Sequence, residues 1–447
     1  MRINPLEAIK TKTQAELRQE AERYMPGGVG GAGRINSALG YAFYIKEAKG
    51  CRLWDTDGKE YIDFNLGHGS AFLGYQHPAT QAAAEKALAA GILAGYETEA
   101  HVQLAKRVTE IIPCAERVRY GNTGSEGTMI CVRLARAYTK KNKILKFWGH
   151  FHGLYDYMMY NAHTPMTPVE PGSIIKPCQE SAGMPAVNDD LVVVVPWKDE
   201  AALARALEQH GDEIGGIIME PINYNQGCIV ADKEYMELVR RQATAHNITL
   251  IYDEVLSAFR TGPDCAQGYY GVTPDLCVLG KAVANGGAMV ILAGKKEVME
   301  LVGPLGEVAQ SGTFTGNPLA VATALASIEE LCKPGFYDHI YAASERMVSG
   351  LSELFAGAGI PARVQGLGGR FGIFFGSTKP VERFDDTLDR DVDMRSRFVR
   401  AAADKGVYFH DYGSLVAGHH GVSASHTMAD IDEALNRVES AIKGGLS

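Results

Sequence analysis

The sequence lacks three features that would each indicate a class of protein. Its eight cysteines form no C-x-x-C pair, which argues against a zinc knuckle or a disulfide framework. It has no long basic run and a formal net charge of -9, so we expect no nucleic-acid partner. Its apolar stretches are too short to cross a bilayer, and its first residues lack a signal-peptide core. We therefore expect no membrane partner and a cytoplasmic location.

The chain has the composition of an ordinary soluble protein and is long enough for more than one domain. It has 447 residues, of which 46% are hydrophobic and 22% charged. From about residue 75, helical patterns alternate with short apolar runs. These runs are residues 118–120, 144–147, 191–195, 217–219, 250–252, 276–279 and 289–292. Nearly continuous apolar runs are typical of strands buried on both faces, so we predict an α/β fold with a mostly parallel sheet between helices.

The two ends of the chain show different patterns. Residues 11–24 have helical spacing, residues 41–61 indicate a small meander, and residues 366–375 indicate a strand approached by glycines. We expect the N- and C-terminal segments to combine into one smaller α+β domain. The predicted division is an N-terminal segment of the small domain (1–70), a large α/β domain (71–320) and the C-terminal part of the small domain (321–447).

One aspartate and one lysine carry the most informative chemistry. Asp253 ends the most apolar predicted strand, and Lys281 follows 28 residues later, before a loop of small residues. A lysine amine can hold an aldehyde cofactor as a Schiff base, and a buried carboxylate can hold a proton on the cofactor's ring nitrogen. Together they are what pyridoxal phosphate requires of a protein. Taken singly, Asp253 could form a structural ion pair and Lys281 could be a solvated surface residue.

Two hydroxyl-rich loops each precede a predicted helix. In residues 121–127, the backbone N–H groups and side chains of Thr123, Gly124 and Ser125 could hold a phosphate at a helix N-terminus. The alternative is a plain helix cap, since threonine and serine are common caps. Residues 310–318, which include Thr313, allow the same two interpretations.

Further candidates follow other strands. Phe151 could stack on a planar ring or pack in the core, and it lies between His150 and His152. The two histidines have no acidic or cysteine ligand close in sequence, so we expect no metal site. Asn225 could donate to a cofactor oxygen or stabilise a turn. Val255 could cover the second face of the ring.

Along the chain these elements are the 121–127 loop, the segment with Phe151, the turn with Asn225, the Asp253 and Lys281 pair, and the 310–318 loop. These five elements, in this order at strand ends, resemble the class III aminotransferase family of fold-type I pyridoxal phosphate enzymes. The chain is similar to the branch with glutamate-1-semialdehyde aminomutase and some D-aromatic and β-amino-acid aminotransferases. The resemblance runs from about residue 26 to residue 426. It is most specific in residues 251–260, 267–276, 279–281 and 312–318.

The resemblance implies a role for each candidate. Lys281 would hold the cofactor and move a proton, while Asp253 would keep the ring nitrogen protonated. Thr313 would reach the phosphate of the neighbouring subunit, which implies a homodimer with shared active sites. Arg34 falls where the branch keeps a carboxylate-binding arginine. The remaining implied cofactor contacts are Thr123, Gly124, Ser125, Phe151, His152, Asn225 and Val255.

The substrate side departs from the aminomutases. Gly418 stands where they have a glutamate, His68 lies near the place of a pocket tryptophan, and residues 288–290 replace a Pro-Val-Gly. These changes favour an aminotransferase that moves an amino group from a carboxylate-bearing amino acid to a keto acid. His68 and Tyr155 are predicted substrate residues, although His68 could also be a core histidine. The alternatives are an intramolecular aminomutase, an amino-acid racemase, or a catalytically silent protein of this fold.

Overall fold

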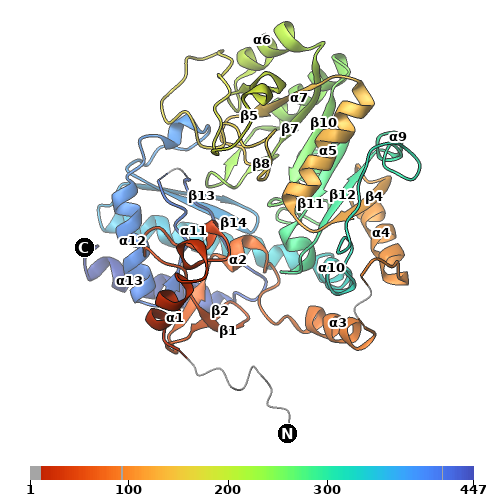
Figure 1. Cartoon of the computed structure of the whole chain (residues 1–447). Helices are drawn as coiled ribbons and strands as arrows, with labels where there is room; N and C mark the ends of the chain where they lie inside the picture. Colours follow the sequence, from red (N-terminus) through yellow and green to blue (C-terminus); the bar gives the residue numbers. More distant parts are fainter. Residues whose placement is uncertain (1–11, 92–93, 415, 447) are drawn as a thin grey trace.

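A seven-stranded sheet forms the centre of the larger part of the molecule. The computed structural model describes residues 12–91, 94–414 and 416–446. The strands are β4 (Arg117–Gly121), β5 (Lys143–Phe147), β6 (Val192–Val195), β7 (Ile214–Met219), β10 (Thr249–Glu254), β11 (Leu276–Leu279) and β12 (Val290–Gly294). Their order in the sheet is β4-β12-β11-β10-β7-β5-β6 (Figure 1). Each of the seven predicted apolar runs overlaps one of these strands.

The sheet is mostly parallel, as predicted, with one exception. Strand β12 runs antiparallel to both β11 and β4, whereas β10, β11, β7, β5 and β6 pair in parallel. Only residues 280–289 connect β11 to β12. A parallel connection needs a crossover of a dozen or more residues, so this short segment forces β12 to reverse direction.

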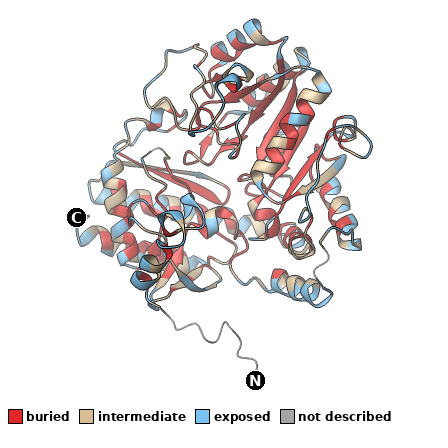
Figure 2. Cartoon of the chain, viewed as in Figure 1, coloured by how far each residue is buried: buried red, intermediate tan, exposed pale blue. Residues whose placement is uncertain are grey.

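Helices cover the sheet and exclude water from it. Figure 2 shows the central strands almost wholly buried. Helix α5 (Gly124–Thr139) packs across β7, β10, β11 and β12, and its buried side includes Gly127, Cys131, Leu134 and Ala135. This spacing places them on one helix face. A side chain at Gly127 would begin 2.5 Å from Val278 Cγ1, so the glycine permits the close helix–strand approach.

Segments from both ends of the chain build the smaller α+β part, as predicted. Strand β15 (Val407–Tyr408) pairs in parallel with β3 (Glu60–Asp63), which continues antiparallel through β2 (Arg52–Asp55) to β1 (Ile45–Lys49). The other helices and strands are α1 (Gln14–Ala21), α2 (Leu66–Gly69), α3 (Pro78–Ala89), α4 (Glu99–Ile111), α6 (Glu200–His210), α7 (Lys233–Ala245), α8 (Cys265–Tyr270), α9 (Lys296–Met299), α10 (Pro318–Leu331), α11 (Phe336–Gly357), α12 (Val392–Asp404), α13 (Met428–Lys443), β8 (Ile222–Asn223), β9 (Ile229–Val230), β13 (Ala362–Leu367), β14 (Arg370–Phe375) and β16 (His420–Gly421).

Two predicted elements have different bounds in the structure. The single strand expected over residues 366–375 is wrong, because the chain reverses at Gly368 and forms the hairpin of β13 and β14. Gly368 has φ +57°, and a Cβ there would lie 2.1 Å from Arg260 O, so only glycine fits this turn. The helix expected over residues 11–24 is α1, whose N-cap is Thr13. The expected start at residue 11 lies outside the described residues.

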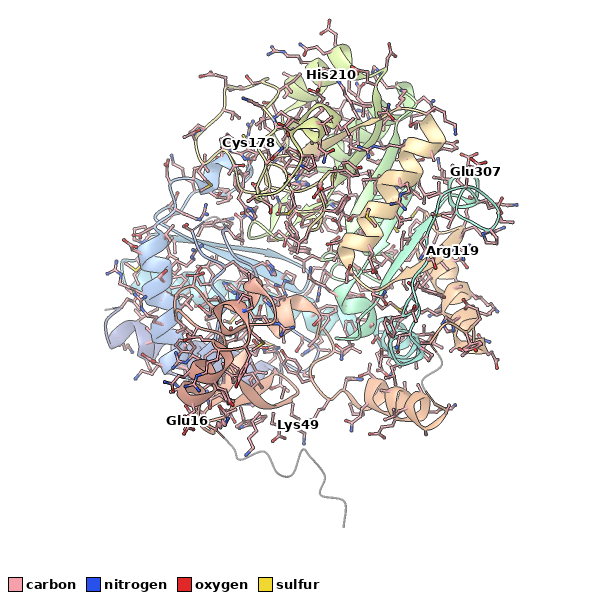
Figure 3. All side chains as sticks on the ribbon, in the orientation of Figure 1. Glu16, Lys49, Arg119, Cys178, His210 and Glu307 are labelled. Atoms are coloured by element: carbon pink, nitrogen blue, oxygen red, sulfur yellow. The ribbon has the colours of Figure 1, made fainter. Side chains whose placement is uncertain are left out.

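In the part of the chain that the structure describes, the surface, the cysteines and the helices show no feature that indicates a specific function. Figure 3 shows Glu16 and Lys49, which have opposite charges, at one end of the molecule and His210 toward the other. All eight cysteines are free thiols. Among the described helices, none combines the length and hydrophobicity that a membrane crossing requires.

Candidate active site

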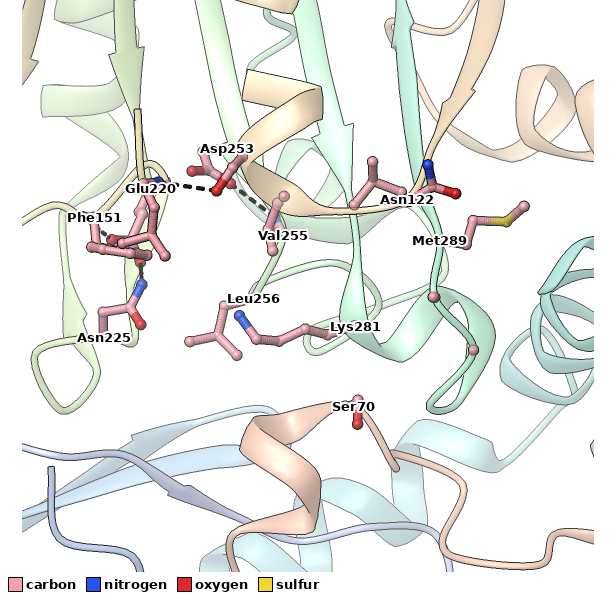
Figure 4. Close-up of a pocket in the computed structure, with 17 residues that line it drawn as sticks. Ser70, Asn122, Phe151, Glu220, Asn225, Asp253, Val255, Leu256, Lys281 and Met289 are labelled. Atoms are coloured by element: carbon pink, nitrogen blue, oxygen red, sulfur yellow. Dashed lines mark hydrogen bonds between the residues drawn. The ribbon is translucent and has the colours of Figure 1, made fainter. Parts of the chain in front are cut away.

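A cavity of about 330 Å³ lies where β10 and β11 end, within the size range of small-molecule sites. Figure 4 shows Lys281 entering it below Asp253 and Val255, with Ser70 across from the lysine. Ligands of α/β proteins bind at this carboxyl edge of the sheet. The cavity is lined by Ser70, Asn122, Gly124, Ser125, Phe151, Gly153, Leu154, Glu220, Asn225, Asp253, Val255, Leu256, Lys281, Gly287, Ala288, Met289 and Val290.

Asp253 is a buried carboxylate held by two donors. Its Oδ2 lies 2.8 Å from Nδ1 of His152, and its Oδ1 accepts the backbone N–H of Val255 at 3.0 Å. Burial lowers the pKa of His152, so the imidazole is neutral and donates through Nδ1–H to the carboxylate. A carboxylate has about four acceptor positions, which leaves Asp253 free to accept a further proton donor from the cavity.

Lys281 follows β11 in a strained backbone conformation. Its φ is +46°, a left-handed value that non-glycine residues rarely adopt and that is found most often at functional sites. The preceding Gly280 packs against Val255, where a Cβ would lie 3.0 Å from the valine Cγ1. Burial lowers the pKa of Lys281 to about 8, while the negative charge of Asp253 acts in the opposite direction. Near neutral pH, a fraction of this amine is therefore unprotonated and nucleophilic.

The N-terminus of α5 provides part of the predicted anion site. Gly124 and Ser125 line the cavity, but the exposed Thr123 does not. The Thr123 hydroxyl instead accepts the backbone N–H of Glu126 at 3.2 Å and caps the helix. The Glu126 carboxylate also accepts the backbone N–H groups of Thr123 and Asn122. The backbone N–H groups of Gly124 and Ser125 remain the better candidates for holding an anion.

Glu220 is a cavity residue that the sequence reasoning did not select. It follows β7, is 2% exposed, and accepts the backbone N–H of Phe151 at 2.8 Å and the side chain of Asn225 at 2.9 Å. Burial and the nearby charge of Asp253 raise the pKa of Glu220 to about 8. It therefore links Phe151 and Asn225, two predicted cofactor contacts. A carboxylate directly after a fully apolar strand was the available signal.

We expect Glu220→Gln to stabilise the ligand-free protein at alkaline pH. The folded carboxyl stays protonated up to about pH 8, whereas in the unfolded chain it ionises above about pH 4.5. Its contribution to stability is thus present below pH 4.5 and is lost as pH rises toward 8. Thermal melts should show the variant roughly 3 °C or more above wild type at pH 8, with the gap closing at pH 5.

The matched control for this prediction is Glu208→Gln on the exposed face of α6. Its effect on the melting temperature should be small and should not change between pH 5 and pH 8. A Glu220→Gln shift of equal size at both pH values would mean that Glu220 is ionised in the folded protein.

Four other predicted residues do not line this cavity. Arg34 and His68 line a second cavity of about 550 Å³, in which His68 Nδ1 lies 2.8 Å from the hydroxyl of Tyr412. The Tyr155 side chain packs into the core beside α5, so it does not line the Lys281 cavity. Thr313 lies on an exposed loop.

Both histidines of the predicted H-x-H pair have other partners. His150 Nδ1 accepts the backbone N–H of Glu220 at 3.0 Å, and His152 donates to Asp253. Among the described residues, no group of three or more histidine, cysteine, aspartate or glutamate side chains is placed to bind a metal ion.

The cavity thus brings together a nucleophilic amine, a buried carboxylate, a helix N-terminus that can bind an anion, and the side chains of Phe151 and Val255. A planar ligand with an aldehyde, a basic ring nitrogen and a phosphate matches each of these groups.

Comparisons with known proteins agree with this geometry. The family model for class-III aminotransferases matches residues 36–442. The glutamate-1-semialdehyde 2,1-aminomutase of Nitrosomonas europaea is 34% identical over 426 residues, which cover 95% of each chain.

Solved structures are similar over nearly the whole length. An omega-transaminase from Sphaerobacter thermophilus has a TM-score of 0.89 and 28% identity, over 96% of this chain and 97% of that one. A transaminase with PLP bound has a TM-score of 0.87 and 26% identity, over 98% and 99% of the two chains.

Proposed function

The chain belongs to the class-III aminotransferase family, and we propose that it is an aminotransferase with pyridoxal phosphate as its cofactor. Its fold is that of the fold-type I enzymes of this cofactor. The proposed reaction moves an amino group from a carboxylate-bearing amino acid to a keto acid. The single observation that carries the proposal is the arrangement of Lys281 and Asp253 around one cavity.

The residues present fit pyridoxal phosphate. The Asp253 carboxylate has acceptor capacity left after binding His152 and Val255, which suits a protonated ring nitrogen. The α5 N-terminus at Gly124 and Ser125 suits the phosphate. The cofactor, when bound, supplies an aldehyde that combines with amines and a ring that withdraws electrons.

The residues that hold the cofactor have distinct tasks in this proposal. The Lys281 amine holds the cofactor until a substrate amine replaces it, and its freed Nζ then moves a proton from the substrate Cα. Asp253 keeps a proton on the ring nitrogen, and His152 fixes the carboxylate in position. Phe151 and Val255 hold the ring between them, while Glu220 orients Asn225 toward the ring's oxygen.

The substrate side of the cavity supports transfer between two substrates. Among the described residues that line it, the only carboxylates are Glu220 and Asp253, both of which we assign to the cofactor side. Gly418, which stands where aminomutases have a glutamate, has φ +87° and does not line this cavity. Ala288 and Met289, two further departures from the aminomutases, do line it.

A second candidate is amino transfer within one substrate, as in glutamate-1-semialdehyde aminomutase. The names of the sequence relatives favour this candidate over the first, because aminomutases 34–36% identical to the chain cover it almost completely. Racemisation of an amino acid is a further reaction that the same Lys281 amine could perform by returning the proton to the substrate Cα.

Turnover with and without an added keto acid separates these candidates. We expect a single amino donor, such as an α- or β-amino acid, to release its keto product once and then stop until pyruvate or 2-oxoglutarate is added. Continuous conversion of glutamate-1-semialdehyde without any acceptor would instead establish the aminomutase. Loss of optical activity without a keto product would establish a racemase.

We propose that two copies share their active sites. Thr313 is exposed here, together with Phe314, whose side chain is 64% exposed. A largely apolar hollow nearby, between α3, α4 and α10, is lined by residues that include Ala87, Pro318 and Leu325. Burying this surface against a second copy would bring the Thr313 loop toward the neighbouring subunit's cavity.

A further inference from the structure

Lys281 lies in a single 3₁₀ turn, η4 (Lys281–Ala284), between two residues with left-handed backbone conformations. Lys281 itself has φ +46°, and Asn285, which ends the turn, has φ +43°. Beyond Asn285 the chain continues through the exposed Gly286 and Ala288, which give the turn little support on that side. The position of the Lys281 side chain therefore depends on how the end of this short turn is anchored.

The side-chain amide of Asn285 anchors the turn to a distant segment of the chain. Its Oδ1 accepts the backbone N–H of Leu73 at 2.9 Å, and its Nδ2 donates to the backbone carbonyl of Gly74 at 2.9 Å. The backbone N–H can only donate and the carbonyl can only accept, so these partners fix which way round the amide lies. We call these two hydrogen bonds the Asn285 clamp.

The backbone conformation at Asn285 does not by itself require an asparagine. A glycine would adopt φ +43° with less strain and would end the turn equally well. What asparagine adds is one donor and one acceptor on the same short side chain. An aspartate has the same size but only acceptors, so it would place a negative oxygen against the Gly74 carbonyl.

The clamped segment is also fastened to the smaller part of the molecule. The Ser425 hydroxyl donates to the Leu73 carbonyl at 2.7 Å, and the Ala424 N–H donates to the Phe72 carbonyl at 2.9 Å. A Cβ at Gly74, whose φ is +95°, would lie 2.0 Å from Ser425 Oγ, so the contact is very close. The Asn285 clamp therefore joins the Lys281 turn to a segment that the smaller part holds in place.

The same segment forms the cavity wall opposite Lys281. Ser70 lines the cavity and lies three residues before Leu73, and Figure 4 shows it across from the lysine. Two tight turns separate it from the clamp, since the Phe72 N–H donates to the Ser70 carbonyl and the Gly74 N–H to the Ala71 carbonyl. The clamp thus holds two opposite sides of the cavity at a fixed separation, although Asn285 itself does not line it.

We propose that Asn285 is a positioning residue that locks the Lys281 turn to the Ser70 wall, and so fixes where the Lys281 amine lies relative to a substrate in the cavity. This inference rests on the proposed amino-group transfer at Lys281. A base must be within hydrogen-bond reach of the proton that it removes. A misplacement of about 1 Å, caused by a change away from the reacting atoms, can cost about 10²-fold in rate.

Two variants at this position test the proposal. Asn285→Gly keeps the left-handed backbone and removes both hydrogen bonds, whereas Asn285→Asp keeps the size and removes the donor. Both should lower kcat per cofactor-loaded site by about 10- to 10²-fold and leave KM for the amino donor within about threefold. This pattern is expected because the lysine amine acts on the substrate during the reaction and not during binding.

A donor deuterated at Cα gives a readout that a loss of folding stability does not change. If the Lys281 amine is misplaced, removal of the Cα proton becomes slower and limits turnover more strongly. The ratio of kcat for the protonated donor to kcat for the deuterated donor should therefore be larger in both Asn285 variants than in wild type. A variant that is only less stable has fewer folded molecules, but each of them keeps the wild-type ratio.

Hydrogen exchange of the cofactor-loaded protein tests the clamp without any turnover. Asn285→Gly should raise amide exchange in residues 70–75 and in residues 281–287 together, by about fivefold or more, because the two segments lose their connection. Exchange in the strands of the central sheet should stay as in wild type.

Asn161 provides a matched control, because its side chain forms a similar clamp elsewhere. It has φ +46° and donates to the carbonyls of Thr164 and Lys176 at 3.0 and 3.2 Å, in the connection between β5 and β6. Asn161→Gly should lower the melting temperature but keep kcat per cofactor-loaded site within about threefold of wild type, with an unchanged isotope effect. Asn247→Gly, at an exposed left-handed position after α7, should change none of these quantities.

Three results would overturn the proposal. These are wild-type kcat in both Asn285 variants, an equal loss of kcat in Asn161→Gly, or a lowered kcat with an unchanged isotope effect. If wild type transfers no amino group from any donor, the proposed function itself fails. Hydrogen exchange distinguishes that case, because it reports the connection between the two segments whether or not the protein is an aminotransferase.

Discussion

Replacing Lys281 by alanine is expected to reduce amino-group transfer by about 10⁴-fold or more. The amine is both the point of cofactor attachment and the group that moves the substrate's Cα proton, so its removal eliminates two tasks at once. The rest of the cavity remains, so the variant should still bind pyridoxal phosphate noncovalently. Steady-state kcat with the best amino donor, together with equilibrium dialysis of the cofactor, measures both effects.

Lys296→Ala is the matched control, because this lysine is 56% exposed and lies on α9 away from the cavity. Its kcat should equal that of wild type. Retention of more than about a tenth of wild-type kcat by Lys281→Ala would show that another residue carries the proton.

Replacing Asp253 by asparagine is expected to lower kcat by roughly 10²–10³-fold, which is the usual cost of removing one preorganised electrostatic contact. The amide cannot hold a proton on the ring nitrogen, so the ring withdraws electrons less strongly. The change also turns the His152 contact from charge-assisted to neutral and should weaken cofactor affinity. Both kcat and the dissociation constant of pyridoxal phosphate should be measured.

The neighbouring residue provides the control for this second prediction. Glu254 is also buried on β10, but its carboxylate binds Gln267 and the Ala266 backbone on the side away from the cavity. Glu254→Gln should keep kcat within about tenfold of wild type. Equal losses in Asp253→Asn and Glu254→Gln would mean that the strand tolerates no change there, and that Asp253 has no special role.

The sequence was sufficient to predict that Asp253 and Lys281 lie together, because the local sequence signals agreed with the global fold. Asp253 lies near the end of the fully buried strand β10 and Lys281 follows the adjacent parallel strand β11, so both come to one edge of the sheet. Phe151, Asn225 and Val255 lie at the same edge, and the structure places all five around one cavity. Their catalytic and binding roles stay predictions until the variants are measured.

The roles of Thr123 and Glu220 could not be determined from the sequence. Thr123 satisfies the pattern of an anion loop and that of a helix cap equally well, and the structure shows it as the cap. Glu220 directly precedes Pro221 at the start of a turn, and its importance depends on the Phe151 and Asn225 contacts that only the fold creates.

The substrate side was the least predictable because it depends on how the two parts of the molecule pack. Arg34 and His68 share a different cavity, and Tyr155 packs beside α5.

The most direct test of the central claim is to identify the lysine that carries the cofactor. The purified protein, saturated with pyridoxal phosphate, is reduced with borohydride and digested, and the peptides are analysed by mass spectrometry. We predict a single phosphopyridoxyl modification, located on Lys281 and absent from Lys281→Ala. A modification on another lysine with Lys281 unmodified would contradict the assignment of this cavity as the active site.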